Sequence, residues 1–304
     1  MHLFQTIIMP IKEESAHLPP AAYVVLAVLL WSTGGLFIKL TSFNAFAVNA
    51  GRSLFAALTV ALFTYRKGLP FNGFILIKSL LYAGTLSCFV YANKTTTAAN
   101  AIFLQYTAPI YILVLSPFVL KEKFRPADLA TVVLCIGGMA LFFVDDSQTT
   151  SAPNVFLGNI VALASGVFFG LYILLLRHPA ASHDNPAVSV FYGNLIIVLV
   201  MLPLIISDPP EVVHLSDLAA ILFLGIFQIG LAYILFTTGV AAGVRSLDAS
   251  IIGFIEPLFN PVWVFIFIGE KPSSWALLGG VIIILTVALH TWISTRRKVV
   301  LAKV

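Results

Sequence analysis

The chain contains ten long apolar runs in succession, and these runs limit the folds that it can adopt. Each has about the 20 residues that an α-helix needs to cross the hydrocarbon core of a bilayer. Of the 304 residues 60% are hydrophobic and 10% are charged, whereas an ordinary soluble domain is about 25% charged. We therefore expect an all-α polytopic membrane protein without a soluble nucleotide-binding domain. The predicted spans are residues 21–40, 45–65, 74–92, 98–120, 127–144, 156–176, 187–206, 219–240, 247–268 and 275–294.

The basic residues fall unevenly on the two sides of this array. If the N-terminus is cytoplasmic, thirteen Lys and Arg residues lie inside and three lie outside, with Arg52 left within a span. Cytoplasmic loops accumulate Lys and Arg, so we predict an inner (plasma) membrane protein with both termini in the cytoplasm. The net charge of +4 is then explained by topology, and we expect no nucleic-acid binding. The three outside residues are Lys39, Lys94 and Lys271.

An internal repeat relates the two halves of the chain at a register of 148 residues. Ten identities occur over 41 aligned positions, including Pro109 with Pro257 and the polar pair Glu122-Lys123 with Glu270-Lys271. Each unit holds five spans, an odd number, so the second unit enters the membrane from the opposite side. Inverted repeats of this kind are a common construction of alternating-access transporters. The predicted units are residues 21–146 and 156–294, with cytoplasmic tails at 1–20 and 295–304 and an external linker at 147–155.

These features together resemble the EamA family of the drug/metabolite transporter superfamily. The resemblance rests on a proline thirteen residues before Glu122 and again before Glu270, on the step Trp31-Ser32, on Arg52, and on the two five-helix halves. It implies a secondary transporter, often an exporter of amino acids or other small metabolites. It also implies a central cavity formed by helices one to four and six to nine, with helices five and ten at the periphery.

Two ionisable residues lie deep within the predicted spans, where a charge is costly unless it is paired or faces water. Glu256 falls near the middle of the ninth span, and Arg52 lies about seven residues from the outer end of the second. A carboxyl group at the midplane can exchange a proton or bind a substrate amine, and a guanidinium can hold a substrate carboxylate. The alternative is a structural ion pair between Glu256 and Arg52, or for Arg52 bonds to backbone carbonyls.

Amide and aromatic side chains within the spans are further candidates. A pocket for an amphipathic solute needs aromatic walls with a few convergent polar groups. Buried amides also join helices, and most of the 25 Phe residues serve packing. Among the aromatic residues we favour those away from span ends. The candidates for substrate or proton binding are Asn49, Gln105, Asn194, Gln228 and Asn260 among the amides, and Trp31, Tyr106 and Tyr172 among the aromatic residues.

Three prolines interrupt the fourth and ninth predicted spans. Pro109, Pro257 and Pro261 each remove a backbone hydrogen bond and permit a kink. Such positions can act as gating hinges or expose carbonyl groups to a cavity. The alternative is a static kink. We treat the three prolines as hinge candidates.

No enzyme or metal motif accompanies these residues. The sequence contains no HExxH, no phosphate-binding glycine loop, no GxSxG and no Cys/His cluster. Cys88 and Cys135 lie within apolar runs and are interpreted as small buried hydrophobic residues. His178 and Asp184 share a cytoplasmic loop and are interpreted as solvated. We therefore predict no catalytic residue, no metal ion and no cofactor.

The sequence thus favours a secondary active transporter over two other classes of membrane protein. We expect export of small amphipathic metabolites, such as amino acids, by alternating access and with proton coupling. A membrane enzyme acting on lipid lacks its motif here. In a non-transporting receptor or assembly protein, the polar groups deep within the spans would have no function. The substrate, the direction of transport, the coupling ion, and the choice between monomer and homodimer are left open.

Overall fold

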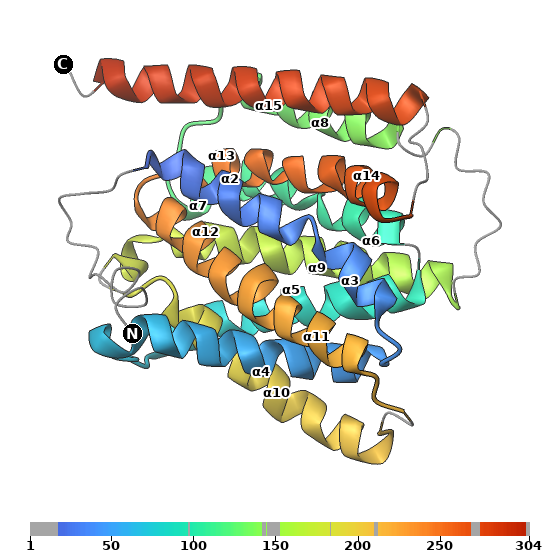
Figure 1. Ribbon diagram of the computed structural model, residues 1–304. Helices are drawn as coiled ribbons and strands as arrows, with labels where there is room; N and C mark the ends of the chain where they lie inside the picture. The colour runs from blue at the N-terminus through green and yellow to red at the C-terminus, as the bar shows by residue number, and fades with distance from the viewer. Residues whose placement is uncertain are drawn as a thin grey trace, which may run out of the picture.

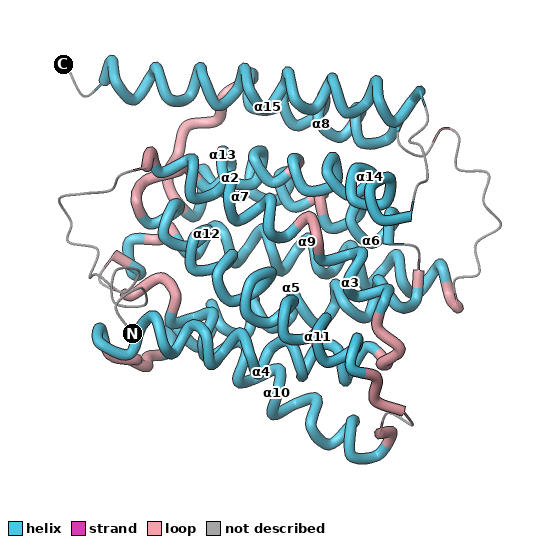
Figure 2. Tube along the Cα trace, in the orientation of Figure 1, coloured by secondary structure: helices cyan, strands magenta, loops and turns pink. Residues whose placement is uncertain are grey.

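The computed structural model describes residues 18–96, 98–141, 144, 153–182, 184–209, 212–268 and 274–301. Over these residues the protein is helical throughout, without a strand (Figure 2). Eight helical segments are long and apolar enough to cross a membrane. Two more units, α8 and the pair α13–α14, bring the number to the ten that the sequence predicts. We call each of these ten units a rod; a rod is one helix or a few helices placed end to end.

The first five rods include two that consist of separate helices placed end to end. They are α2 (Pro20–Trp31) with α3 (Gly34–Leu40), α4 (Ala45–Thr64), α5 (Gly73–Thr95), α6 (Ala98–Gln105) with α7 (Ala108–Val119), and α8 (Pro126–Ala140). Asparagine caps two of the starts, because the side-chain oxygens of Asn44 and Asn72 accept hydrogen bonds from the amides of Ala47 and Ile75.

The second five rods complete the bundle. They are α9 (Val155–Leu176), α10 (Val188–Ser207), α11 (Leu215–Phe223) with the π-helical turn η4 (Leu224–Leu231) and α12 (Ala232–Ala241), α13 (Ser246–Gly253) with α14 (Ile255–Ile268), and α15 (Ser274–Leu301). The tenth rod therefore runs beyond residue 294, where the predicted span ends.

The fourth and ninth rods break near Pro109 and Pro257, two of the three prolines predicted to interrupt the spans at 98–120 and 247–268, whereas α14 continues through Pro261. The helix α6 ends at Gln105, four residues before Pro109, and α13 ends at Gly253, four residues before Pro257. A proline cannot donate to the carbonyl four residues earlier, so each helix stops at that carbonyl. The internal repeat therefore places one break at the same position in each half.

A third break divides the first rod, predicted as continuous over 21–40. The hydroxyl groups of Ser32 and Thr33 donate to the carbonyls of Leu29 and Leu30 at 2.7 Å each. Such local bonds compete with the helical ladder, which explains why α2 ends at Trp31. Trp263 of α14 donates from its Nε1 to Ser32 Oγ at 2.9 Å and so joins the ninth rod to this break.

The helices α8 and α15 pack against each other and form a layer on one side of the other eight rods (Figure 1). This agrees with the peripheral position that the family resemblance implies for helices five and ten. Their approach is close, because a Cβ atom on Gly138 would lie 3.1 Å from the carbonyl oxygen of Gly279.

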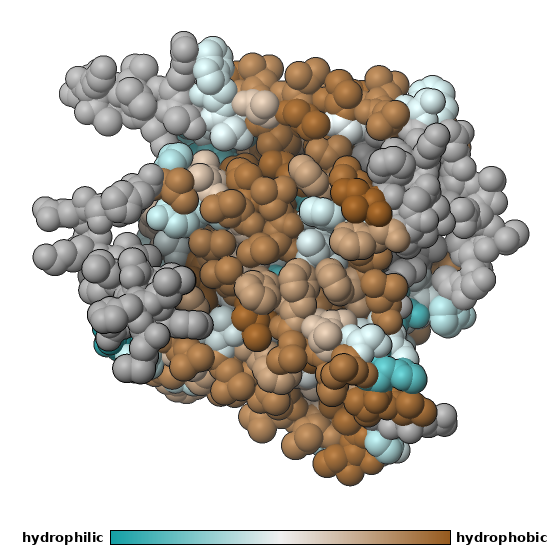
Figure 3. Space-filling view, viewed as in Figure 1, coloured by the Kyte–Doolittle hydropathy of each residue, from teal (hydrophilic) through white to brown (hydrophobic). Residues whose placement is uncertain are grey.

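The outer surface of the bundle is largely apolar on the face shown in Figure 3. Large hydrophobic side chains are exposed along many of the rods, including Leu62, Phe118 and Ile206. A soluble protein rarely exposes apolar area over so many elements, whereas lipid-facing helices must.

Candidate functional site

The breaks in the fourth and ninth rods bring Tyr106 and Glu256 together. The hydroxyl group of Tyr106 donates to Glu256 Oε2 at 2.6 Å. Both side chains are buried, with 2% and 8% of their surfaces exposed. The Tyr106 ring also packs on Phe254, its equivalent in the repeat, with ring centroids 5.4 Å apart. Glu256 is thus held through a hydrogen bond that spans the two halves of the chain.

Arg52 does not pair with Glu256, so the ion-pair alternative is wrong. No ion pair joins the two among the residues that the structure describes. Arg52 is fully buried, and its Nη2 makes two long bonds of 3.4 Å, to Asn49 Oδ1 and to the carbonyl of Leu86. Its Nε and Nη1 atoms have no hydrogen-bond partner within the described residues. Two buried donors of a cation are therefore available to a ligand.

Aromatic rings lie beside these two groups. Tyr233 lies close enough to Arg52 and to Glu256 to interact electrostatically with both. Its ring packs on those of Trp31 and Tyr82, with centroid distances of 4.7 and 4.8 Å. Rings in such contact provide the apolar walls that a small-molecule site needs.

Tyr172 joins the same group, and Tyr82 and Tyr233 extend it beyond the predicted residues. The Tyr172 ring lies 5.5 Å from that of Tyr82 and 6.4 Å from that of Tyr233, and all three side chains are buried. The central aromatic cluster therefore consists of Trp31, Tyr82, Tyr172 and Tyr233. Tyr82 lies about as far inside its apolar run as Tyr172 does, so the same criterion of depth could have selected it.

Two of the predicted amides join helices to one another. Asn49 donates to Ser87 Oγ at 3.0 Å, which connects α4 to α5. Gln105 donates to Ser165 Oγ at 2.9 Å, and Ser165 in turn donates to the carbonyl of Thr85. The polar hydrogens of these amides are engaged in interhelical bonds.

Asn194 and Gln228 differ because each leaves a buried oxygen without a partner among the described residues. Asn194 donates to Tyr82 OH at 2.9 Å and to the carbonyl of Val190, so it is fixed against the central aromatic cluster. Gln228 lies in the π-helical turn η4, a form often found at functional sites. Its amide lies against Gly34, where a Cβ atom would approach Nε2 within 2.5 Å.

The prolines occupy different places relative to the breaks. Pro109 is the second residue of α7, and Pro257 is the third residue of α14. Pro261 and the candidate Asn260 belong to α14 by their backbone, but their side chains lie outside the described part of the chain. The hinge role of the three prolines stays a prediction.

Hydrogen bonds at one end of the bundle help to cover the central residues. The amide and hydroxyl groups of Ser42 both donate to Asp217, at 2.8 Å each. Thr96 donates to Asn159 Oδ1 at 2.9 Å. Because Arg52, Glu256 and the aromatic residues beside them are buried, the structure shows this group closed to solvent.

The described residues contain no group of three or more His, Cys, Asp or Glu side chains that could hold a metal ion. Cys88 and Cys135 are free thiols. The interpretation of Asp184 as a solvated loop residue is wrong, because Asp184 forms an ion pair with Lys78 of α5 at 2.8 Å.

Comparison with known proteins assigns the chain to a family. The EamA-like transporter family matches residues 18–144 and 156–292. The chain is 24% identical over 290 residues to solute carrier family 35 member G1 from Homo sapiens, covering 89% of this chain and 79% of that protein. It is 26% identical over 219 residues to the pseudopaline exporter CntI from Pseudomonas aeruginosa (strain UCBPP-PA14), covering 72% and 74% of the two chains.

A solved crystal structure shares the fold. It aligns with a TM-score of 0.78 at 20% identity and covers 91% of this chain and 98% of the other. The family and the relatives named above are transporters rather than enzymes, which agrees with the lack of an enzyme motif in the sequence. The chain belongs to the EamA-like transporter family and is a multi-pass membrane transporter.

Proposed function

We propose that the protein exports small zwitterionic metabolites such as amino acids across the inner membrane, in exchange for protons and by alternating access. The observation that carries the proposal is that a buried cation, Arg52, and a buried carboxyl group, Glu256, both lie close enough to Tyr233 to interact with it electrostatically. A cationic donor and a carboxyl group beside the same aromatic cluster match a solute that carries a carboxylate, an amine and an apolar body.

Arg52 is the group that we propose for the substrate carboxylate. Its Nε and Nη1 atoms are buried without a partner among the described residues. A buried donor without a partner is costly, so binding a carboxylate there recovers free energy. The unpartnered oxygens of Asn194 and Gln228 are acceptors that can receive hydrogen bonds from the substrate amine.

Glu256 is the group that we propose for the coupling proton. It has a single described hydrogen-bond partner, Tyr106, and no described cation within ion-pair distance. A carboxyl group buried in this way can bind a proton when the substrate leaves and release it when the substrate arrives. Competition for one site gives exchange of substrate and proton without further machinery.

The direction of transport follows from the same exchange. With both termini in the cytoplasm and protons entering from outside, each inward proton returns the transporter for another outward step. The pseudopaline exporter CntI, 26% identical to this chain over 219 residues, is one relative whose name states this direction. The breaks beside Pro109 and Pro257 supply a flexible point in each half, as alternating access requires.

Flux measurements in proteoliposomes test the proposal. Radiolabelled amino acids are screened for accumulation against their gradient when a pH difference is imposed across the vesicle membrane. We expect Glu256→Gln to abolish proton-driven accumulation while substrate still binds, because glutamine has a similar shape but does not titrate. Asp208→Asn is the matched control, since Asp208 is an exposed carboxylate at the end of α10.

Accumulation by Glu256→Gln in response to a pH difference would show that another group carries the proton. Flux in the unmodified protein that does not depend on the pH gradient would contradict proton coupling altogether. Absence of flux for every zwitterion in the screen, with flux for a solute that lacks a carboxylate, would contradict the assignment of the substrate class.

A further inference from the structure

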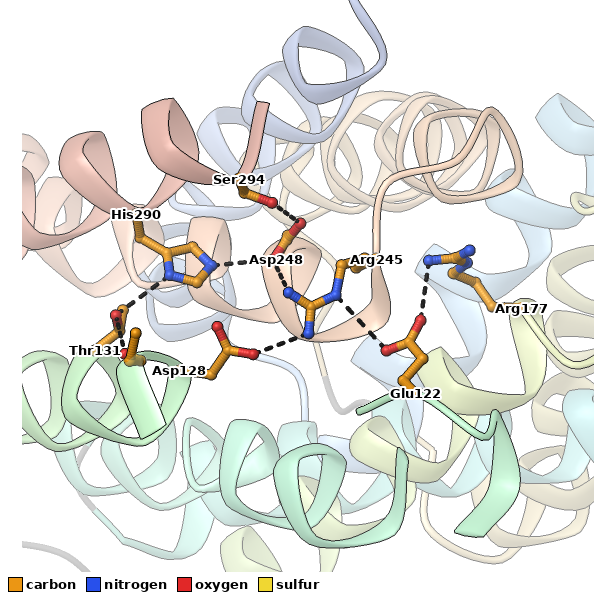
Figure 4. Close-up of polar contacts among 9 residues, drawn as sticks. Glu122, Asp128, Thr131, Arg177, Arg245, Asp248, His290 and Ser294 are labelled. Atoms are coloured by element: carbon orange, nitrogen blue, oxygen red, sulfur yellow. Dashed lines mark hydrogen bonds and ion pairs between the residues drawn. The ribbon is translucent and has the colours of Figure 1, made fainter. Parts of the chain in front are cut away.

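A second group of charged side chains lies away from the centre, where α8 and α15 meet the start of α13 (Figure 4). Asp248 of α13 accepts hydrogen bonds from three side chains: His290 Nε2 at 3.0 Å, Ser294 Oγ at 2.5 Å and Arg245 Nη1 at 3.4 Å. His290 and Ser294 belong to α15, so this single carboxylate ties the tenth rod to the ninth.

Arg245 extends the group to the first half of the chain. Its Nη2 donates to Asp128 of α8 at 2.9 Å, and its Nε lies 3.7 Å from Glu122. Glu122 is also 3.3 Å from Nη1 of Arg177, at the end of α9. We call Glu122, Asp128, Arg177, Arg245, Asp248 and His290 the Asp248 cluster. It crosses between the two halves at the end of the bundle opposite Ser42 and Asp217, so separating the halves there requires breaking it.

The charges of the Asp248 cluster balance only if His290 carries a proton. Two guanidinium groups face three carboxylates, which leaves one negative charge in excess. Burial opposes the charge of Arg245, but Asp248, Asp128 and Glu122 outweigh it and raise the pKa of Arg245 above its ordinary value. A cation whose pKa is raised keeps its charge at every pH below that value. Arg245 therefore stays positive and does not produce a pH response.

The hydrogen bonds of His290 place a proton on Nε2. The carboxylate of Asp248 only accepts, so Nε2 of His290 donates to it. Nδ1 of His290 lies 3.2 Å from Thr131 Oγ1, which also bonds to the carbonyl of Ala127 at 2.9 Å, and the donor of the Nδ1 contact depends on the protonation of the ring. Because a hydroxyl group can accept as well as donate, Nδ1 keeps this partner when it binds a proton.

The Asp248 cluster belongs to one end of the bundle only. At the register of 148 residues, Asp248 corresponds to Asn100 and His290 corresponds to Phe142. The first half therefore has neutral residues where the second half has its acid and its histidine. A feature that the duplication does not share can stabilise closure at one end without stabilising closure at the other.

A pocket of about 330 Å³ opens beside the Asp248 cluster between α8 and α15, lined in part by Arg125, Arg245 and His290. An anionic ligand is a poor match for it, because each guanidinium nitrogen of Arg245 lies beside a carboxylate and each ring nitrogen of His290 lies beside a polar group of the protein. Water and protons need no free donor to enter. The pocket therefore gives His290 contact with solvent while its bonds remain in place.

We propose that His290 and Asp248 form a proton-binding site that holds this end of the transporter closed when it is protonated. Loss of the proton weakens the bond of His290 to Asp248 and leaves an excess negative charge between α8, α13 and α15, so the carboxylates repel one another and opening is favoured. With the orientation given above, this end faces the cytoplasm, so an alkaline cytoplasm opens the site for substrate loading. The proposal rests on alternating access, and it does not depend on the identity of the substrate.

The other titratable groups around His290 are accounted for. The elements packed against α15 carry Asp128 and Cys135 on α8, Asp248 on α13, and Glu256 on α14, which is bonded to Tyr106. Arg125 and Arg245 lie beside the pocket, and Arg296, Arg297 and Lys298 follow on α15 itself. Apart from Glu256, which we propose for the coupling proton, histidine is the side-chain type in this set that ordinarily changes charge within the physiological pH range.

The test measures opening rather than flux. A reporter cysteine replaces Ser246, which is fully buried two residues before Asp248, in a background carrying Cys88→Ala and Cys135→Ala. Its alkylation by a membrane-impermeant maleimide is divided by that of the exposed Lys123→Cys, which corrects for the pH dependence of thiol reactivity. We expect the ratio to rise several-fold between pH 5.5 and pH 8.5, the range over which histidine ordinarily loses its charge.

Two substitutions at His290 should move the response in opposite directions. His290→Gln has no positive form, so its ratio should be high at both pH values. His290→Lys carries a charge throughout and has room in the pocket, so its ratio should be low at both. His214→Gln, a substitution at the other end of the bundle, should keep the full response.

A pH response that persists in His290→Gln or in His290→Lys would overturn the proposal, as would its absence in the parent protein. The melting temperature of each variant separates gating from unfolding, and His290→Lys decides if His290→Gln does not fold. Because accessibility is measured without substrate, a protein that gates with pH yet moves no amino acid refutes the proposed substrate and leaves this inference intact.

Discussion

The hydroxyl group of Tyr106 donates a 2.6 Å hydrogen bond to Oε2 of Glu256 and so joins the two broken rods beside their breaks. Tyr106 directly follows the end of α6, and Glu256 is the second residue of α14. A conformational change that separates the two halves at this depth must alter the bond. In the proposed mechanism, the protonation of Glu256 is therefore linked to the positions of the fourth and ninth rods.

Tyr106→Phe should uncouple substrate exchange from the pH gradient. The substitution keeps the ring contact with Phe254 but removes the donor to Glu256, and a buried group that loses its partner costs about 1–3 kcal/mol. We expect substrate exchange to lose much of its dependence on the pH gradient, measured as flux across proteoliposomes. Tyr111→Phe, on the same rod, is the control and should behave as the unmodified protein. An unchanged pH profile in Tyr106→Phe would show that this bond plays no part in coupling.

Arg52→Ala should weaken the binding of carboxylate-bearing substrates more than it weakens folding. A hydrogen bond to a charged group contributes about 1.5–3 kcal/mol, so we expect the KM of a zwitterion to rise about tenfold or more. Arg52→Lys keeps the charge without the planar pair of donors and should give an intermediate KM. Arg66→Ala, an exposed arginine beside Tyr65, is the control.

Thermal stability distinguishes the two roles of Arg52. A melting temperature that falls in proportion to the lost flux would mean that Arg52 is a structural residue, bonded to Asn49 and to the backbone of Leu86.

Much of the architecture is predictable because lipid imposes it. Apolar runs of fixed length must become helices, since backbone groups in the bilayer have no other partners, and the number of rods follows. The positions of the breaks were harder to predict, because a proline such as Pro109 indicates that the helix is disturbed nearby but does not say at which residue it ends. Its effect on Gln105, four residues earlier, becomes clear only from the helix ends.

The candidate site was predictable in its depth but not in its pairings. Depth within a span identifies Glu256 and Arg52, but it does not show that both lie near Tyr233. Contacts between residues far apart in sequence depend on the packing of whole rods. His290 was overlooked for a related reason, since a histidine near the end of a span resembles an interfacial residue until Asp248 is placed beside it.

The orientation of the chain is a prediction that reporter fusions can check. A reporter that is active only in the cytoplasm should work when it is fused after Lys303, and one that is active only outside should work when it is inserted at Asp145. The physical reason is the excess of basic residues on one side of the array, thirteen against three. The opposite pattern of activity would contradict the inverted repeat as assigned here.

Pro109→Ala should join α6 and α7 into one helix. Alanine restores an amide that can donate to the carbonyl of Gln105, and proline in a helix interior costs about 3 kcal/mol relative to alanine. We expect a melting temperature equal to or above that of the unmodified protein, together with flux several-fold lower, because the flexible point is lost. Pro117→Ala, inside α7 and away from the break, is the control. Normal flux in Pro109→Ala would indicate a static break.

The ion pair between Lys78 and Asp184 should matter for stability and little for transport. The two atoms Lys78 Nζ and Asp184 Oδ2 lie 2.8 Å apart, with 1% and 10% of their side chains exposed. Removing one partner leaves a buried charge alone, so Lys78→Met and Asp184→Leu should each lower the free energy of unfolding by about 3–5 kcal/mol. The double variant removes both charges and should recover most of that loss, since apolar replacement of a buried pair is often close to neutral. Denaturation of the purified protein in detergent measures all three variants, and flux per folded molecule should stay within about twofold of the unmodified protein. If the double variant is as unstable as either single variant, the two charges do not act as a pair, and the loop that carries Asp184 is held by other contacts.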